Sequence, residues 1–327
     1  MFFLFYIILV PLSAACAAGF AAWMRRLRLG QQIREYGPKL HEPKSGTPTM
    51  GGTVVMLIWA GSVGVRSLVH PLYWPGEFVL LSGIIFASIG FTDDLLSLCR
   101  HRSLGLRPYQ KILLVSLGAM GLFLLFPGIG RIPFRMPFSR DIVTLPVGLS
   151  FFIYWAVFLA TTNSMNLTDG LDGLATGTTI LILVGFLLIV HKPPVLAVIG
   201  PLIPILIGFL WVNAHPARLF LGDVGSFGLG GIVAAVAITS GTSFVLPLLA
   251  GLLVLEAGSV ILQVAAFKAF GVRIFKISPL HHHFEKAEGI DYPYLLPNIE
   301  WSEEKIVARL WIIESLFVAL SVLAMRM

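Results

Sequence analysis

The sequence predicts an all-α polytopic membrane protein with about ten transmembrane helices. Of its 327 residues, 57% are hydrophobic and only 12% are charged, and the mean hydropathy is +0.87. This composition excludes an ordinary soluble domain. The apolar residues gather in runs of the roughly 20 residues that a helix needs to cross a bilayer. The basic residues gather in alternate connections between these runs.

The apolar runs define the expected helices, with ends placed to within a few residues. They cover residues 2–24, 50–69, 77–97, 111–127, 147–165, 173–191, 195–213, 224–242, 244–269 and 306–325. The first run lacks the small-residue cleavage site of a signal peptide, so we expect it to be retained. No separate soluble domain is indicated, and we expect residues 1–327 to form one integral membrane domain.

Lysine and arginine set the expected orientation, because basic loops stay in the cytoplasm. Most of the 23 basic residues follow an odd-numbered run, and the exceptions are Arg66, Arg131, Arg135, Arg140, Lys192 and Arg326. The odd-numbered connections are therefore expected in the cytoplasm, with both termini outside. The net charge of +6 follows from this bias. We expect no nucleic-acid partner, although cytoplasmic cations also favour an anionic substrate or anionic lipid.

The first cytoplasmic connection ends in the run KSGTPTMGG at residues 44–52. Lys44 offers charge, Thr49 offers a hydroxyl, and the glycines let a phosphate or a nucleobase approach closely. The order and spacing are not those of a P-loop. The alternative interpretation is a turn that begins the second helix.

The third run ends in the adjacent carboxylates Asp93 and Asp94. Anions are disfavoured at a helix C-terminus and are costly beside a membrane unless they are solvated, paired or bound to a cation. A simple capping role therefore fails for this pair, and contact with Mg²⁺ or a proton-bearing substrate fits better. Lys111, at the start of the fourth run, faces the same border and can neutralise a phosphate.

Between the fifth and sixth runs lies NSMNLTDGLDGLATG, residues 163–177, which carries Asn166, Asp169 and Asp172. If a helix begins here, the two carboxylates share one face of its first turn. The alternative is that they only cap this helix, because acids are favourable at a helix N-terminus.

The connection after the seventh run offers Asn213, Phe220, Gly222 and Asp223. Asp223 lies in a glycine-rich turn before an apolar helix, so it is a plausible metal ligand, and Phe220 can offer a ring to a base. His215, which precedes a proline, is more typical of a structural residue.

Polar residues also occur within and after the ninth run. Glu256 and Gln263 interrupt it, and an intramembrane carboxylate suggests function unless a neighbouring helix satisfies it. The following loop carries His281, His282 and His283. Adjacent histidines point in different directions and have no partner cysteine or HExxH motif, which disfavours zinc. We interpret them as donors to a phosphate, sugar or carboxylate.

Apart from Glu256 and Gln263, these polar groups lie at the expected cytoplasmic connections, whereas the outward loops carry nothing comparable. A transporter would place its key polar groups near the membrane midplane. The one-sided pattern instead favours an enzyme with a cleft at the inner leaflet that takes one soluble and one lipid substrate. Several carboxylates with a few cations are typical of Mg²⁺-assisted phosphoryl chemistry.

Five motifs, in this order, resemble the polyprenyl-phosphate N-acetylhexosamine-1-phosphate transferase superfamily over nearly the whole chain. They are KSGTPTMGG at 44–52, the Asp93-Asp94 pair, NLTDGLDGLA at 166–175, LGDVGS at 221–226 and PLHHHFE at 279–285. The acidic motifs are shared by the superfamily. The histidine run and the 44–52 loop resemble its muramoyl-pentapeptide branch.

The resemblance implies transfer of phospho-N-acetylmuramoyl-pentapeptide from its UDP carrier to undecaprenyl phosphate, with Mg²⁺, giving lipid I and UMP. It also implies a homodimer in the bacterial inner membrane, with membrane lipids around it and the active site facing the cytoplasm. A break in the ninth helix is expected as well, and Gly258 is a plausible place for it.

By motif match, Asp223 is expected to bind Mg²⁺. Asp93 is expected to deprotonate the lipid phosphate, with Asp94 beside it and Lys111 nearby. The expected uridine pocket consists of Lys44, Thr49, Gly170, Leu171, Asp172, Asn213 and Phe220. Diphosphate or sugar contacts are expected from Asn166, Asp169, His281 and His282, and Gly222, Gln263 and His283 complete the expected substrate-binding set.

The sequence leaves alternatives open for both the mechanism and the class of protein. The lipid phosphate can attack directly, which we favour, or a carboxylate can first form a phosphoryl-enzyme. A sibling transferase that uses UDP-N-acetylglucosamine shares the acidic motifs. A transporter or flippase is the alternative from a different class.

Overall fold

A computed structural model describes residues 2–27, 46–100, 105–286 and 292–327 of the chain. Apart from one two-stranded hairpin, the regular elements in these ranges are helices, which confirms the predicted all-α membrane class. The longer helices are α1 (Phe2–Arg26), α2 (Gly51–Ser67), α3 (Trp74–Arg100), α4 (Pro108–Leu125), α5 (Val147–Thr168), α6 (Leu174–Ile189), α8 (Leu202–Asn213), α9 (Gly222–Ser240), α11 (Gly251–Phe270) and α13 (Glu303–Ala324). The short elements are η2 (Pro127–Arg131), β1 (Phe134–Arg135), β2 (Ile142–Val143), α7 (Pro193–Ile199), α10 (Leu246–Leu249) and α12 (Leu280–His283).

Each of the ten predicted runs corresponds to a helix or a helix pair. Within the described ranges, eight helices are long and apolar enough to cross a membrane, so the protein is a multi-pass membrane protein. The other two runs form α2, with 17 residues, and α6, with 16 residues. The seventh run is divided into α7 and α8 at Gly200–Pro201, and both residues keep right-handed helical backbone angles.

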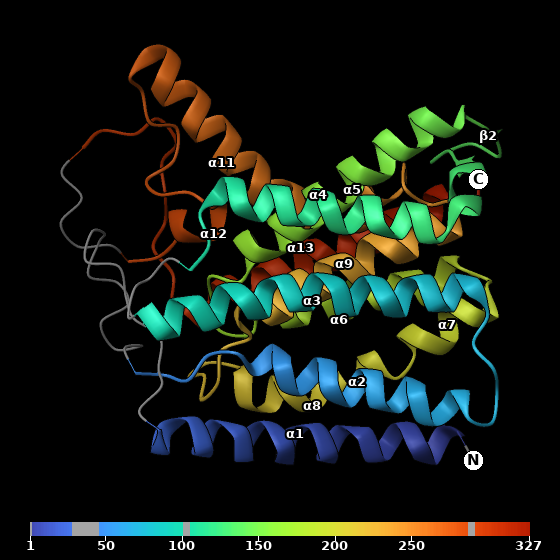
Figure 1. The fold of residues 1–327 in the computed structure, drawn as a ribbon. Helices are drawn as coiled ribbons and strands as arrows, with labels where there is room; N and C mark the ends of the chain where they lie inside the picture. The colour runs from blue at the N-terminus through green and yellow to red at the C-terminus, as the bar shows by residue number, and fades with distance from the viewer. Residues whose placement is uncertain (1, 28–45, 101–104, 287–291) are drawn as a thin grey trace.

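The ninth run is broken, as predicted, but not at Gly258. The break lies at Ala250, between α10 and α11, where φ is −114° and ψ is 47°. The prediction of Gly258 is wrong because α11 continues as regular helix through that residue. Beyond the break, α11 tilts away from the other helices (Figure 1), and apolar side chains such as Ile261 and Phe267 are exposed along it.

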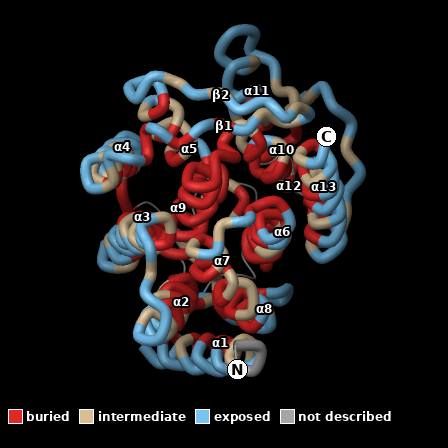
Figure 2. The backbone as a smooth tube through the Cα atoms, turned by 90° about the vertical axis from the view of Figure 1, so that its right-hand side faces the viewer, coloured by how far each residue is buried: buried red, intermediate tan, exposed pale blue. Residues whose placement is uncertain are grey.

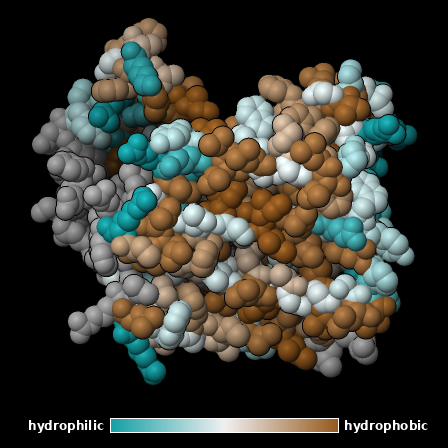
Figure 3. Space-filling model, viewed as in Figure 1, coloured by the Kyte–Doolittle hydropathy of each residue, from teal (hydrophilic) through white to brown (hydrophobic). Residues whose placement is uncertain are grey.

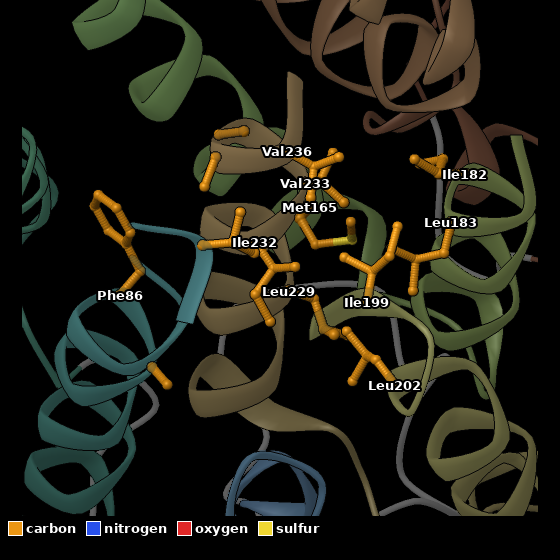
Figure 4. Packing of buried hydrophobic residues seen from close by; sticks show 14 of the residues in the cluster. Phe86, Met165, Ile182, Leu183, Ile199, Leu202, Leu229, Ile232, Val233 and Val236 are labelled. Atoms are coloured by element: carbon orange, nitrogen blue, oxygen red, sulfur yellow. The ribbon is translucent and has the colours of Figure 1, made fainter. Parts of the chain in front are cut away.

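Helix α9 forms the centre of the fold. Its residues from Val224 to Ser240 are all buried, and it packs against α2, α3 and α5 (Figure 2). The close crossing with α3 depends on Gly90, because a Cβ there would meet the backbone of Asp223. Figure 4 shows the apolar packing around α9; its labelled side chains are Phe86, Met165, Ile182, Leu183, Ile199, Leu202, Leu229, Ile232, Val233 and Val236.

The two ends of the helix bundle differ. Both chain termini and the β1–β2 hairpin lie at one end, and α12 lies at the other (Figure 1). Between the ends, hydrophobic side chains cover most of the visible surface (Figure 3). This surface is the one that a bilayer would cover, because water-exposed apolar area of such extent is unfavourable.

Candidate active site

The site is built around an ion pair at the end of the bundle that holds α12. Lys111 Nζ, from the first turn of α4, lies 2.5 Å from Asp223 Oδ2 and 3.1 Å from Asp93 Oδ2. The other oxygen of Asp223 accepts a hydrogen bond of 2.7 Å from Asn166 Nδ2. The other oxygen of Asp93 accepts one of 2.6 Å from the Leu106 amide. Four residues predicted from three separate stretches of the sequence therefore meet in one cluster.

Four helix ends bring these side chains together. Asp93 lies near the C-terminal end of α3, Lys111 near the start of α4, Asn166 near the end of α5 and Asp223 in the first turn of α9. Consecutive antiparallel membrane helices return the chain to the same border, so polar residues at alternate connections converge. This convergence is the reason that a one-sided sequence pattern predicted a common site.

Asp94 interacts with a different helix from its own. Its Oδ2 accepts a hydrogen bond of 3.1 Å from the Val224 amide in the first turn of α9. A carboxylate is favourable there because of the exposed amides and the helix dipole. The expectation from sequence that this pair has no capping role considered only the C-terminus of α3, the helix that carries Asp94, and not the N-terminus of α9. Gly222 makes the contact possible, because its φ is +75° and a Cβ would lie 2.7 Å from Asp94 Oδ2.

The 46–52 segment packs directly on the turn that precedes α9. The amide of Phe220 donates to Pro48 O at 2.9 Å, and that of Gly51 donates to Phe220 O at 2.8 Å. Thr49 is buried beside Gly222, and the Phe220 ring is half-buried. Two predicted nucleoside-binding motifs are thus neighbours. Lys44 lies outside the described residues.

Asn213 and Asp172 hold neighbouring turns in place. Asn213 accepts from the Thr176 hydroxyl at 2.7 Å and donates to Leu219 O at 3.0 Å. Asp172 Oδ2 accepts from the Ala217 amide at 2.9 Å. Asn213 therefore joins the end of α8 to the first turn of α6, and Asp172 joins the α5–α6 connection to the α8–α9 connection.

His281 is fully buried and pairs with Glu256 of α11. Its Nδ1 lies 3.0 Å from Glu256 Oε2, and a Cβ at Gly170 would meet its Nε2. Within the described residues Nε2 has no hydrogen-bond partner. The carboxylate fixes the ring orientation and directs Nε2 at the Gly170 turn. Sequence reasoning kept Glu256 out of the site, although an intramembrane carboxylate was the available signal.

The remaining predicted residues near α12 support the loop. His282 Nδ1 lies 2.5 Å from Glu285 Oε2, while His283 Nδ1 accepts from the Lys276 amide at 3.0 Å. Gln263 Oε1 accepts from the amides of both residues 274 and 275, each at 2.9 Å. His283 and Gln263 thus use their polar atoms on the chain's own backbone, and the structure does not bring them to the acidic cluster.

Ionisation outside the membrane spans follows burial and charge. Burial raises the pKa of Asp169 well above its ordinary value, and the negative charges of Asp223 and Asp94 raise it further. The Gly222 amide hydrogen bond to Asp169 opposes this effect. Burial lowers the pKa of His282, and the neighbouring His281 lowers it further.

The acidic cluster offers carboxylate oxygens that could serve as ligands of a divalent cation. Asp93, Asp94, Asp169 and Asp223 lie close enough for their charges to interact, and Lys111 is the one cation paired with this group in the described residues. Carboxylate oxygens are the preferred ligands of Mg²⁺. A divalent cation would offset the excess negative charge, so the donor set fits such an ion.

A second group of potential ligands lies beside Asp172. Within the described ranges, ligand atoms of Asp172, His215 and Glu303 lie within 4.8 Å of one another. Sequence reasoning set His215 aside and gave Glu303 no role. A histidine before a proline and an acid in a helix's first turn are both common in structural settings, so the sequence carried no signal for their contact.

Comparison with known proteins agrees with this geometry. Residues 77–241 match the model of glycosyl transferase family 4. The matched range contains the acidic cluster, Lys111, and the α5–α6 and α8–α9 connections. The chain therefore belongs to glycosyl transferase family 4 and is a membrane-embedded transferase.

More specific relatives cover nearly the whole chain. It is 40% identical over 313 residues to the phospho-N-acetylmuramoyl-pentapeptide-transferase of Caldanaerobacter subterraneus, covering 93% of both chains. It is 41% identical over 335 residues to that of Kocuria rhizophila, covering 89% of this chain and 85% of the relative. The same transferase of Heliobacterium modesticaldum is 42% identical over 279 residues, covering 80% and 82%. Within family 4, the chain belongs to the phospho-N-acetylmuramoyl-pentapeptide-transferases.

Proposed function

We propose that the protein transfers phospho-N-acetylmuramoyl-pentapeptide from UDP-N-acetylmuramoyl-pentapeptide to undecaprenyl phosphate. The products are UMP and lipid I, the first lipid-linked peptidoglycan precursor. The names of the relatives support the substrates. The structural observation that carries the proposal is Lys111 held between Asp93 and Asp223, because phosphoryl transfer needs a cation beside carboxylates that can bind metal or accept a proton.

In this proposal the acidic cluster serves the reacting phosphates. Asp223 would hold Mg²⁺, which when bound would offset the negative charge of the reacting phosphates. Asp93 accepts the proton of the lipid phosphate, and Lys111 stabilises the negative charge at the phosphates. Asp94 supports the start of α9, which positions Asp223.

The donor lies across the two neighbouring turns. Thr49, Gly170, Leu171, Asp172, Asn213 and Phe220 surround the uridine, together with Lys44 and Gly222. Asn166, Asp169, His281 and His282 contact the diphosphate or the sugar. Asn166 supports this assignment because it bonds Asp223 and is therefore beside the expected metal. Gln263 and His283 contribute indirectly, because they hold the backbone of the loop that carries His281 and His282.

We favour direct attack by the lipid. An oxygen of undecaprenyl phosphate forms a bond to the β-phosphorus of the donor, and the bond from that phosphorus to the bridging oxygen breaks. UMP leaves with the bridging oxygen, and a proton on the attacking phosphate passes to Asp93. In this route Asp93 serves as the proton acceptor and Asp223 as the metal ligand, so neither carboxylate forms a bond to phosphorus. A radiolabelled protein intermediate that lipid phosphate discharges would contradict direct attack.

The proposal includes the cellular setting. The acidic end of the bundle faces the cytoplasm of a bacterial inner membrane, and both termini face outward. The basic connections at the acidic end support this orientation, because loops rich in Lys and Arg stay in the cytoplasm. The location of the donor agrees with it, because soluble UDP-linked donors are cytoplasmic. We also propose that residues 1–327 act as one domain and that two copies form a homodimer.

A donor comparison tests this function. Purified protein in detergent is given undecaprenyl phosphate with either UDP-N-acetylmuramoyl-pentapeptide or UDP-N-acetylglucosamine, and UMP and lipid product are measured. We expect both products with the pentapeptide donor alone. Turnover with the acetylglucosamine donor alone would identify the sibling transferase. No turnover with either, in folded protein, would contradict the proposal and favour a transporter.

A further inference from the structure

The first turn of α13 is joined to the α5–α6 connection by a polar contact. Glu303 Oε1 accepts a hydrogen bond of 2.8 Å from the Asp172 amide, across 131 positions of sequence. Glu303 has a side-chain exposure of 12%, so water competes weakly for this bond. The contact fixes the backbone of a turn that contributes Gly170, Leu171 and Asp172 to the proposed uridine pocket.

His215 completes the link from the α8–α9 connection. Its Nδ1 lies 3.1 Å from Asp172 Oδ2 and 3.4 Å from Glu303 Oε2. Its Nε2, on the other side of the ring, lies 3.3 Å from Glu304 Oε1. The imidazole therefore stands between Asp172 and the start of α13, and a second donor, the Ala217 amide, directs the same Asp172 oxygen.

Apolar contacts hold the same turn against α13. Leu171 and Leu174 pack in a buried cluster with Ile306, Val307 and Leu310. This packing sets the distance between the turn and the helix, but apolar contacts are not directional. Glu303 and His215 supply the direction, because hydrogen bonds fix both the backbone and the carboxylate of Asp172.

We propose that Glu303 and His215 are positioning residues that orient the Asp172 turn for the nucleotide part of the donor. This inference rests on the function proposed above. Neither residue acts on the reacting phosphates. Their loss changes donor affinity and leaves the lipid site, built from other elements, unchanged. The hydrogen bonds among these three groups account for their close approach without a metal ion.

The experiment compares disruptive and conservative variants at each position. Glu303→Ala removes the acceptor, and Glu303→Asp withdraws it by one methylene, whereas Glu303→Gln keeps an oxygen at the same reach. His215→Ala removes the donor, whereas His215→Asn retains an amide near the position of Nδ1. Glu304→Ala is the matched control, because Glu304 is 59% exposed and contacts the outer nitrogen of His215.

Donor KM, lipid-phosphate KM, kcat and UMP affinity are measured for each variant in detergent. For the three disruptive variants we expect donor KM and the UMP dissociation constant to rise about tenfold; these variants are Glu303→Ala, Glu303→Asp and His215→Ala. A rise of this size corresponds to the loss of roughly one net hydrogen bond. Lipid KM and kcat should change less than about twofold. Glu303→Gln, His215→Asn and Glu304→Ala should stay within about twofold of the wild type.

Wild-type donor KM in all three disruptive variants would overturn the inference. Equal losses for donor and lipid, or no rescue by Glu303→Gln and His215→Asn, would overturn it as well, because a general folding role predicts those results. If the alanine variants do not fold, Glu303→Asp against Glu303→Gln decides the question. Absence of turnover and of UMP binding in the wild type would instead refute the proposed function.

Discussion

Lys111 Nζ lies 2.5 Å from Asp223 Oδ2, although 112 positions of sequence separate the two residues. The same ammonium lies 3.1 Å from Asp93 Oδ2, so one cation joins α3, α4 and α9. Desolvated charges of this kind persist when they are paired and hydrogen-bonded. A cation beside several carboxylates is typical of sites that transfer phosphoryl groups.

Removing the ammonium should therefore abolish most activity. We expect Lys111→Met to lower kcat by about 100-fold or more, because a fixed charge that stabilises the transition state is lost. Lys268→Met is the matched control, since Lys268 is exposed in the last turn of α11. Steady-state UMP release measures both. Equal rates for the two variants would show that the Lys111 pair has no catalytic role.

A backbone position beside the cluster gives a second prediction. Gly222→Ala forces a side chain into the left-handed region, at about 1–2 kcal/mol, and brings its Cβ toward Asp94. We expect lower unfolding stability in detergent and lower activity. Gly258→Ala, at a helical site with no atom within 4 Å of the new Cβ, should stabilise by roughly 0.5–1 kcal/mol. A loss of stability in Gly258→Ala would contradict the open, regular helical environment of this residue.

The buried pair of Glu256 and His281 gives a third prediction. Glu256→Gln replaces the carboxylate that lies 3.0 Å from His281 Nδ1 and orients the imidazole, and carboxylate partners of histidines at metal sites contribute roughly 10–100-fold to affinity or activity. We expect UMP release to fall by about tenfold. Glu314→Gln is the control, because Glu314 is equally buried and, among the described residues, its Oε2 accepts from the Leu252 amide alone. Similar losses in both variants would indicate general destabilisation.

The protonation of His283 gives a fourth prediction, which concerns how the stability of the folded protein changes as pH is lowered. Burial lowers its pKa below the ordinary value of 6.5, and its Nδ1 accepts from the Lys276 amide. Between the folded and unfolded pKa values, the unfolded state binds the extra proton, so stability falls as pH is lowered through about 6.5. His283→Asn keeps an acceptor that does not titrate and should flatten this acid-side decline. Unfolding in detergent from about pH 8 to pH 5 measures it, and identical slopes would refute the assignment.

The sequence predicted the parts of the site that depend on helix ends. Asp93, Lys111, Asn166 and Asp223 lie where apolar runs stop, and alternate stops in a membrane protein share one side. Spacing within the chain was enough for this inference. The number of membrane runs followed from the same pattern.

The sequence did not predict contacts that depend on how loops fold back. Glu256 and His281 meet because α11 and α12 are brought together by the intervening loop, whose backbone Gln263 holds. The break at Ala250 likewise depends on packing between α10, α11 and α13, since alanine itself favours helix. His215 has a partner in α13 that no local pattern indicates.

We propose above all that Asp223 organises an Mg²⁺-dependent transfer to lipid phosphate. The most direct measurement is UMP release from UDP-N-acetylmuramoyl-pentapeptide, with undecaprenyl phosphate and a titration of Mg²⁺. The wild type, Asp223→Asn and the exposed hairpin control Asp141→Asn are compared. We expect the wild type and Asp141→Asn to release UMP only with both lipid and Mg²⁺, and Asp223→Asn to be slower by about 100-fold or more. Unchanged release by Asp223→Asn, or release without a divalent cation, would contradict the account.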